Sequence, residues 1–224
     1  MRNIIFAVII LLSVVITADR VYASSKKRTG KAFIGIEYGN QDIEMKTEFI
    51  RRTAGVITEH SRFTNPYTSS VEGLFAGYTI PYKRAYISGR VFFDIFTDEF
   101  RLSSGSSRFV NELNYAYGFD LMPGFYLYRG LSFFGRLGLG RGNFDFVKSS
   151  PTSTTYDVND NLLSYTLGLG FACDITPRFT VKIGVDRIQY DKTEINAELG
   201  LRMDKTLVEP EAESFYLSLQ YNFQ

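Results

Sequence analysis

Apolar side chains recur at every second position along most of the chain. The opening segment places Ala32, Ile34, Ile36 and Tyr38 on one face, with small or charged residues between them. Because successive side chains of a strand point to opposite faces of a sheet, this period predicts β-strands. The same alternation returns near residues 74–80, 85–95, 113–121, 131–139, 163–175, 179–185 and 215–223. We therefore expect an all-β chain of about eight strands.

The lengths of the segments and of their connections indicate a membrane barrel. Strands that cross a bilayer at a tilt need about 9 to 11 residues, and several of the segments are that long. Short connections lie at 81–84, 128–130 and 176–178, and long ones at 41–70, 97–109, 146–160 and 191–213. Short periplasmic turns and long outer loops are typical of outer-membrane barrels. The pattern predicts an eight-stranded antiparallel transmembrane up-and-down β-barrel with four long outer loops.

One further segment, 195–203, also alternates and complicates the strand count. A barrel with both chain ends in the periplasm needs an even number of strands. We interpret 195–203 as part of a hairpin above the membrane. If it spans the membrane, together with a strand hidden in the first long loop, the barrel has ten strands instead.

The polar face of the segments carries charges of both signs. An arginine or lysine that faces lipid at the bilayer midplane costs about 2–4 kcal/mol, so we place this face inside the cylinder. The interior of an eight-stranded barrel is just wide enough for side chains to fill it. Neighbours of opposite sign reduce the cost of burying each charge. We predict an interior charged network of Glu37, Arg90, Asp94, Glu112, Arg136, Lys182 and Asp186.

The first residues have the pattern of a secretory signal peptide. Arg2 supplies the positive start, residues 4–16 are apolar apart from Ser13, and Ala23 ends a segment that a signal peptidase would accept. The apolar run is shorter than the roughly 20 residues of a membrane-spanning helix. We expect cleavage after Ala23, with residues 1–23 as the signal peptide and 24–224 as one barrel domain.

Composition argues against two classes of protein, those that bind nucleic acid and those stabilised by disulfides. The chain has 25 Lys+Arg and 24 Asp+Glu, so it has no overall charge that would attract nucleic acid. Its single cysteine, Cys173, cannot form the internal disulfides on which small secreted domains usually depend. A barrel closed by backbone hydrogen bonds is stable in lipid without them.

Candidate chemistry is sparse. The only histidine, His60, precedes Ser61 in the first long connection, where neither geometry nor pKa is well fixed. The polar run 157–161 has the start of a calcium loop, but Leu162 stands where that loop requires glycine. We expect no catalytic residues, no metal site and no cofactor.

The first and last strands, 33–39 and 215–223, resemble those of small outer-membrane barrels, the family of the OmpA transmembrane domain, OmpX and the opacity-type surface proteins. The resemblance implies a place in the outer membrane, in contact with membrane lipid and lipopolysaccharide. It also implies that aromatic residues closing the last strand are read by the barrel-assembly machinery. Tyr221 and Phe223 match that signal, although Gln224 follows them.

These observations favour a non-enzymatic barrel that presents long extracellular loops for adhesion, interaction with a host or other surface ligand, or envelope integrity. The alternative is a small pore for ions or solutes, which the bulky inward residues Tyr86, Phe92, Phe134 and Tyr216 oppose. A lipid-modifying barrel enzyme would carry a histidine on the barrel wall, and this chain has none there. A soluble lipocalin-like carrier would direct its apolar face inward.

Overall fold

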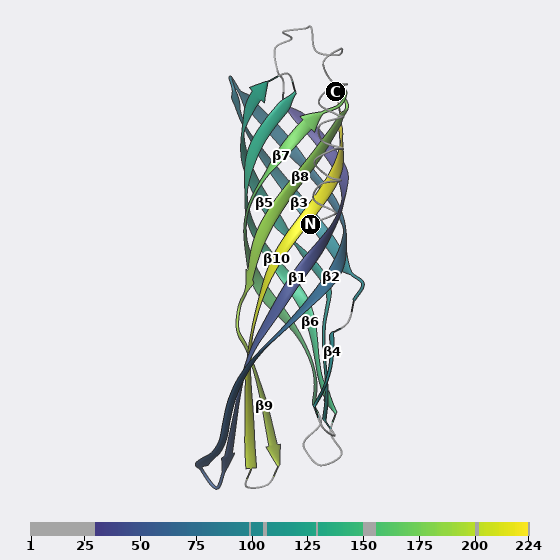
Figure 1. Cartoon of the computed structure of the whole chain (residues 1–224). Coiled ribbons are helices and arrows are strands. Elements are labelled where there is room, and N and C mark those ends of the chain that lie inside the picture. Colours follow the sequence, from purple (N-terminus) through teal and green to yellow (C-terminus); the bar gives the residue numbers. More distant parts are fainter. Residues whose placement is uncertain are drawn as a thin grey trace.

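In a computed structural model, antiparallel strands form a closed cylinder that continues at one end into long hairpins (Figure 1). The structure describes residues 30–98, 100–104, 107–128, 130–149, 156–199 and 202–223. The strands are β1 (Lys31–Thr53), β2 (Val56–Tyr82), β3 (Ala85–Phe96), β4 (Phe100–Ser104), β5 (Ser107–Tyr128), β6 (Leu131–Ser149), β7 (Tyr156–Asp174), β8 (Phe179–Tyr190), β9 (Thr193–Leu199) and β10 (Arg202–Asn222). The predicted signal peptide lies outside the described residues.

Eight strands close the ring, although the described residues form ten strands. The ring runs β1-β2-β3-β5-β6-β7-β8-β10 and closes through the pairing of β1 with β10. β4 follows β3 and pairs with β5, while β9 follows β8 and pairs with β10. The eight-stranded prediction is therefore confirmed. Segment 195–203 covers most of β9, which takes no part in closing the ring, and the start of β10, which precedes the part of β10 that pairs with β8. It is therefore no additional strand of the ring, as we expected.

β4 and β9 each leave the ring for a local reason. Pro210 lies on β10 between residues 202–208, which pair with β9, and residues 211–221, which pair with β8. Proline has no N–H to donate to a ladder, so the pairing on the β8/β9 side of β10 is interrupted there, while the pairing with β1 continues. After β3, the Asp98 carboxylate accepts a hydrogen bond from the Ser70 backbone N–H at 2.9 Å, in place of a strand partner.

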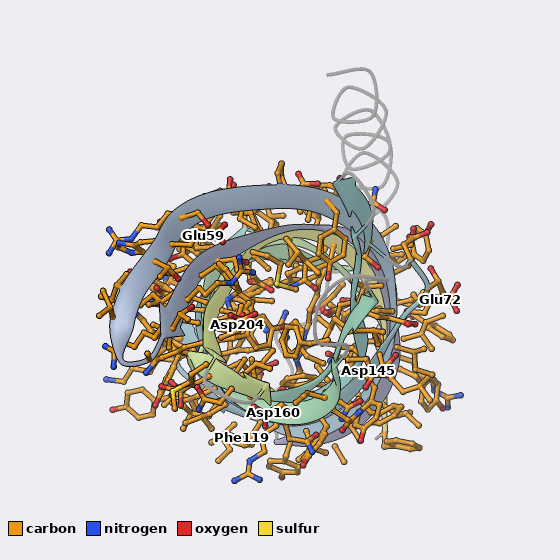
Figure 2. The ribbon with its side chains drawn as sticks, turned by 90° about the horizontal axis from the view of Figure 1, so that it is seen from below. Glu59, Glu72, Phe119, Asp145, Asp160 and Asp204 are labelled. Atoms are coloured by element: carbon orange, nitrogen blue, oxygen red, sulfur yellow. The ribbon has the colours of Figure 1, made fainter. Side chains whose placement is uncertain are left out.

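The outward face of the cylinder is a belt of apolar side chains. On β1, the side chains of Ile34, Ile36 and Tyr38 are all at least half exposed. Viewed along the axis, Phe119 likewise points away from the ring (Figure 2). This face is the one that the alternation assigns to lipid, and its members include Leu74, Ile80, Val91, Phe93, Leu121, Leu137, Leu139, Leu167, Leu169, Val185, Leu217 and Leu219.

Large inward side chains lie over glycines of the neighbouring strand. A Cβ added to Gly168 would lie 1.8 Å from Asp186 Oδ1, and one added to Gly138 would lie 2.4 Å from Asp120 Oδ1. Each of these glycines is the direct cross-strand partner of that aspartate. The same pairing joins Gly73 to Asp94, Gly35 to Phe75, Gly77 to Phe33, Gly124 to Tyr86, Gly118 to Phe92, Gly170 to Phe134 and Gly184 to Tyr216. Glycine thus makes the room that a narrow barrel needs for a filled interior.

The prediction of four long loops is wrong, because most of these residues form strands. β1 continues to Thr53 and β2 begins at Val56, so that only Ala54 and Gly55, both with positive φ (50° and 82°), form the turn. Beyond the belt the two faces exchange character: Ile43 and Met45 point inward, while Asp42 and Glu44 point outward. Residues 41–70 were predicted to be a loop only because we assumed that the apolar side of a strand always faces outward.

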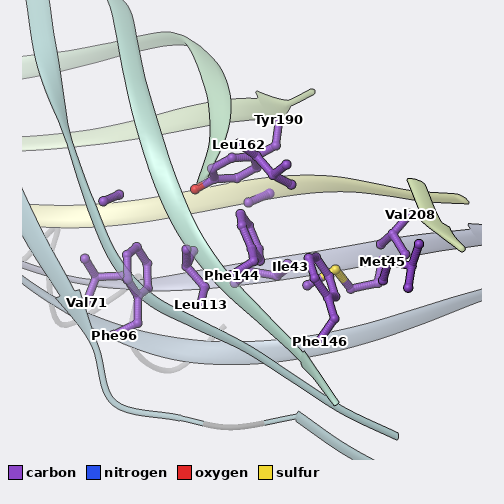
Figure 3. Packing of buried hydrophobic residues seen from close by; sticks show 13 residues of the cluster. Ile43, Met45, Val71, Phe96, Leu113, Phe144, Phe146, Leu162, Tyr190 and Val208 are labelled. Atoms are coloured by element: carbon purple, nitrogen blue, oxygen red, sulfur yellow. The ribbon is translucent and has the colours of Figure 1, made fainter. Parts of the chain in front are cut away.

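The inward apolar residues of the extensions form a core of their own (Figure 3). Ile43 and Met45 from β1 and Val208 and Ala212 from β10 pack in one cluster with residues of the opposite wall. That wall contributes Leu113, Phe144, Phe146 and Leu162. A water-facing sheet hides apolar area on its inner side, as in soluble β-proteins.

A β-bulge in β5 reverses the side to which the residues before it point. The β5–β6 register slips between Leu113 and Tyr115, which leaves Asn114 as the extra residue. Leu113, expected to face lipid together with Tyr117 and Phe119, is instead 1% exposed within the interior core. The period-2 pattern cannot reveal the slip, because both sides of it still alternate.

We predict that Gly168→Ala destabilises the barrel by about 1–3 kcal/mol, the usual cost of overpacking. The new methyl group would overlap the Asp186 carboxylate, which has little space to move within the closed interior. Urea unfolding in lipid vesicles, followed by gel mobility, measures the change. Gly135→Ala is the control, since a Cβ there has only contacts of 3.8 Å or more; equal losses in the two variants would contradict the account.

Candidate functional site

A layer of ion pairs crosses the middle of the cylinder. Arg90 on β3 contacts Asp120 on β5 (Nε–Oδ2, 2.6 Å) and Glu37 on β1 (Nη1–Oε2, 2.7 Å). Arg136 on β6 contacts the same Asp120 oxygen at 2.9 Å and also bonds Asp186 on β8. All five side chains are buried. The layer therefore joins five of the eight ring strands through charge-assisted hydrogen bonds, the stronger class of hydrogen bond.

Aromatic rings cover the cations of this layer. The guanidinium carbon of Arg90 is 4.8 Å from the Phe75 ring centroid, and that of Arg136 is 5.4 Å from Tyr216. Lys182 Nζ lies among three phenylalanine rings, 5.2 Å from Phe33, 5.7 Å from Phe75 and 5.8 Å from Phe134. Ring quadrupoles attract cations, most strongly where water is excluded. Aromatic packing and ion pairing thus fill the same cross-section.

The structure brings together most, but not all, of the residues that the sequence indicated for this network. Glu37, Arg90, Arg136, Lys182 and Asp186 lie within it. Asp94 also points inward, over Gly73, just beyond the ion pairs. Glu112 does not belong: it lies eight residues along β5 from Asp120, opposite Asp145 and beyond the bulge.

Sequence reasoning left out the most central acid. Asp120 is 0% exposed and bonds both arginines through one oxygen. The signal was present, because Asp120 alternates with Phe119 and Leu121 and so belongs to the charged face. Applying the face rule to every charged position would have found it.

The lumen is closed at two levels. The ion-pair layer and its aromatic rings form one, and Tyr86 and Phe134 are buried on the turn side of it. The apolar core of the extensions forms the other. Between the levels lies a cavity of about 30 Å³, lined by Gln41, Asp94 and Tyr216 among others. That volume suits about one water molecule.

His60 and Ser61 do not form a nucleophile–base pair. His60 Nε2 lies 2.7 Å from Glu48 Oε1, and Arg62 donates to the same oxygen at 3.0 Å. These hydrogen bonds hold the pKa of the exposed Glu48 carboxyl below its usual value. Ser61, as the next residue in the strand, points to the opposite face, so His60 cannot activate it.

Two more basic side chains of this hairpin, those of Lys46 and Arg51, are paired with acids. Lys46 Nζ is 2.6 Å from Glu211, and Arg51 bonds Asp204 at 3.0 Å. Within the described parts of the chain, no group of three or more His, Cys, Asp or Glu could hold a metal ion. In the same residues, no helix is long and apolar enough to cross a bilayer.

The final aromatic residues lie at the turn end of the barrel. The rings of Tyr221 and Phe223 are 5.2 Å apart, and Tyr221 also contacts Phe179 at 5.3 Å. Phe223 is 49% exposed. Both follow the outward face of β10 on from Leu217 and Leu219.

A closed ring with an apolar outer belt and an ionic interior is the design of a membrane barrel. A family model described as outer membrane protein beta-barrel domain matches residues 5–223. The chain belongs to this family. It is accordingly a protein of the bacterial outer membrane. In barrels of this kind the short turns face the periplasm.

Solved structures of other outer-membrane barrels resemble the chain. OprG of Pseudomonas aeruginosa is 14% identical with a TM-score of 0.60, and the match covers 88% of this chain and 97% of OprG. Ail of Yersinia pestis is 16% identical (TM-score 0.41; 88% and 100% covered). The Escherichia coli outer membrane protease OmpT is 9% identical (TM-score 0.44; 89% and 100% covered). No curated protein sequence matches the chain. At these identities we take the fold alone from the likeness.

We predict that Arg136→Gln lowers the free energy of unfolding by about 3–5 kcal/mol, because it leaves buried carboxylates without their partner. The matched control is Arg141→Gln on the same strand, an exposed residue for which we expect a change within about 0.5 kcal/mol. Urea titration of both variants in lipid vesicles measures the difference. Similar stabilities for the two variants would show that the ion-pair layer is dispensable.

Proposed function

We propose that this protein is a non-enzymatic outer-membrane anchor whose rigid hairpins form an extracellular binding platform. The observation that supports this most strongly is the closure of the lumen by two layers, while β1 and β10 stay paired from Phe33 to Thr53. A filled interior supports the role of an anchor over that of a pore. The continuous sheet holds the hairpins at a fixed position above the membrane.

The surface of the platform supports a role in recognition. Its outward residues are mostly charged or polar, and its apolar residues are packed inside. Rigid scaffolds that present exposed residues carry binding functions more often than other surfaces do. The ligand that fits this proposal is a host or other external surface molecule.

Two further contacts belong to the same proposal. The apolar belt is the contact surface for membrane lipid and for the acyl chains of lipopolysaccharide. Tyr221, half-buried, and Phe223, exposed, form the signal for the barrel-assembly machinery at the end of the last strand. Replacing Phe223 with alanine should slow assembly in cells more than it weakens the folded barrel.

The binding role is tested by shortening the hairpins. Residues 45–65 and 194–207 are each replaced by Asn-Gly, a two-residue hairpin turn, which keeps the membrane-spanning strands. Cells that display either form are then applied to a panel of immobilised matrix proteins and glycans. We expect adhesion only with the full-length hairpins, and equal adhesion by both forms would overturn the proposal.

We predict that the protein forms no stable channels. In planar bilayers it should give no stepwise conductance, because both the ion-pair layer and the apolar core block the axis. A water-filled porin reconstituted in the same way provides the positive control. Long-lived conductance steps from the unaltered protein would favour the pore instead.

A further inference from the structure

The turn end of the barrel, opposite the hairpins, is rich in positive charge. Every charged residue in the connections 81–84, 128–130 and 175–178 is a lysine or an arginine. This end also carries the C-terminus and the start of β1 (Figure 1). The basic residues that the structure describes here are Lys31, Lys83, Arg84 and Arg178. Together they give the turn end a positive potential.

The protein itself does not neutralise this charge. The side chains of Lys83, Arg84 and Arg178 are exposed, and within the described part of the chain no carboxylate forms an ion pair with them. Asp174, at the end of β7, accepts a hydrogen bond from Thr180 Oγ1 at 2.7 Å. The three exposed cations are therefore available to a partner.

Backbone hydrogen bonds hold two of these cations at fixed positions. The carbonyl of Arg84 accepts a hydrogen bond from the Tyr126 N–H at 2.8 Å, and the carbonyl of Arg178 accepts one from the Asn222 N–H at 2.7 Å. The Arg178 N–H donates in turn to Thr176 Oγ1 at 3.2 Å. A ligand of these side chains therefore has to order no part of the backbone, which lowers the entropic cost of binding.

The backbone of Lys83 is unusual for a lysine. Its φ is 53°, in the left-handed region that glycine and asparagine adopt more readily. Either of those residues would form the two-residue turn between β2 and β3 at a lower conformational cost. The Lys83 ammonium lies 5.4 Å from the centroid of the Tyr82 ring. Since turn geometry does not favour lysine here, its charge is the property that the position uses.

Aromatic rings place these cations at the level of the lipid headgroups. Tyr82, Tyr128 and Phe223 at this end are 69%, 64% and 49% exposed. Exposed aromatic residues of membrane barrels form girdles at the two interfaces between lipid and water. Lys83 and Arg84 directly follow Tyr82 in the turn. They therefore lie beside the phosphate groups of the adjoining leaflet.

The opposite end of the apolar belt is rich in negative charge. Asp42 lies directly across from Glu213, and Glu44 directly across from Glu211. Glu72 also points away from the ring (Figure 2). The basic side chains in contact with Glu211 are Lys46 and Arg187. Because acids outnumber bases here, anionic headgroups are attracted to the turn end of the barrel more strongly than to the hairpin end.

We propose that Lys83 and Arg84 bind the phosphate group of an anionic phospholipid, phosphatidylglycerol, in the leaflet that adjoins the turns. Basic residues beside a membrane attract anionic lipids. The arginine can donate two parallel hydrogen bonds to one phosphate, and the lysine adds a point charge. Arg178 and Lys31, whose Nζ donates to the Pro177 carbonyl at 3.3 Å, form a similar pair at the β7–β8 turn. This site is independent of the proposed binding platform.

The test measures which lipids surround each end of the belt. The chain contains no tryptophan, so one introduced indole reports the lipids beside it. Tyr82→Trp places the indole next to Lys83, and Tyr38→Trp, in a second protein, places it at the hairpin end. Each protein is reconstituted in vesicles of phosphatidylcholine and phosphatidylglycerol. Either lipid is brominated in its acyl chains, and the ratio of the two degrees of quenching gives their relative binding.

The site variant combines Lys83→Asn with Arg84→Gln. Asparagine tolerates a φ of 53°, so the turn keeps its geometry while both charges are lost. The matched control combines Arg52→Gln with Arg62→Gln, which removes two charges from exposed positions of the β1–β2 hairpin. Both are made in the protein that carries Tyr82→Trp. Unchanged gel mobility shows that each variant is folded.

We expect phosphatidylglycerol to be enriched at least about threefold beside the indole at position 82, because each cation at an anionic surface contributes up to about fivefold. At position 38 we expect no enrichment. The site variant should abolish the enrichment and the control should leave it unchanged. Salt at roughly 0.5 M should reduce it, since exposed charges are screened.

No enrichment at position 82, equal enrichment at positions 82 and 38, or enrichment that survives in the site variant would overturn the proposal. Purified cell-wall sacculi test the other anionic partner on this side of the membrane. If the protein sediments with sacculi only when Lys83 and Arg84 are present, and shows no lipid enrichment, the cations bind the cell wall and the lipid site is wrong.

Discussion

The structure depends on the neutralisation of buried charge within a cylinder too narrow for bulk water. Arg90 and Arg136 can lie at its centre only because acids from three other strands meet them there. Removing either partner would leave a charge in a medium that stabilises it poorly. The filled interior in turn requires glycines opposite its largest side chains. The paired charges and the large side chains that fill the interior also close the lumen.

The environment changes along each strand from lipid to water, and this change explains why the barrel and the hairpins have different faces exposed. At the level of the belt, lipid outside requires apolar residues outward, and the ionic residues go inside. Above the belt, water replaces lipid, so the same outward positions carry Asp42 and Glu44 and the inward ones carry Ile43 and Met45. The strand never changes its parity. One continuous sheet can thus serve as both membrane anchor and exposed platform, which gives the hairpins a rigidity that loops lack.

Much of the fold could be predicted from period-2 alternation, because lipid imposes the same rule on every membrane-spanning strand. The ring of eight strands and the inward placement of Glu37, Arg90 and Arg136 followed from it. The hairpins were not predicted because water, and not lipid, surrounds them, so that their apolar side chains face inward. The sequence does not state where the membrane ends. Glu112 was misplaced because the bulge at Asn114 is invisible to a pattern that alternates on both sides of it.

The central claim is that outward positions on β1 face lipid up to Tyr38 and water from Asp42 onward. Single cysteines at positions 34, 36, 38, 42, 44 and 46, in a Cys173→Ser background, test it directly in lipid vesicles. We expect a membrane-impermeant maleimide to label positions 42, 44 and 46, and only a lipid-soluble maleimide to label positions 34, 36 and 38. Labelling of all six by the impermeant reagent, or of none, would contradict the account.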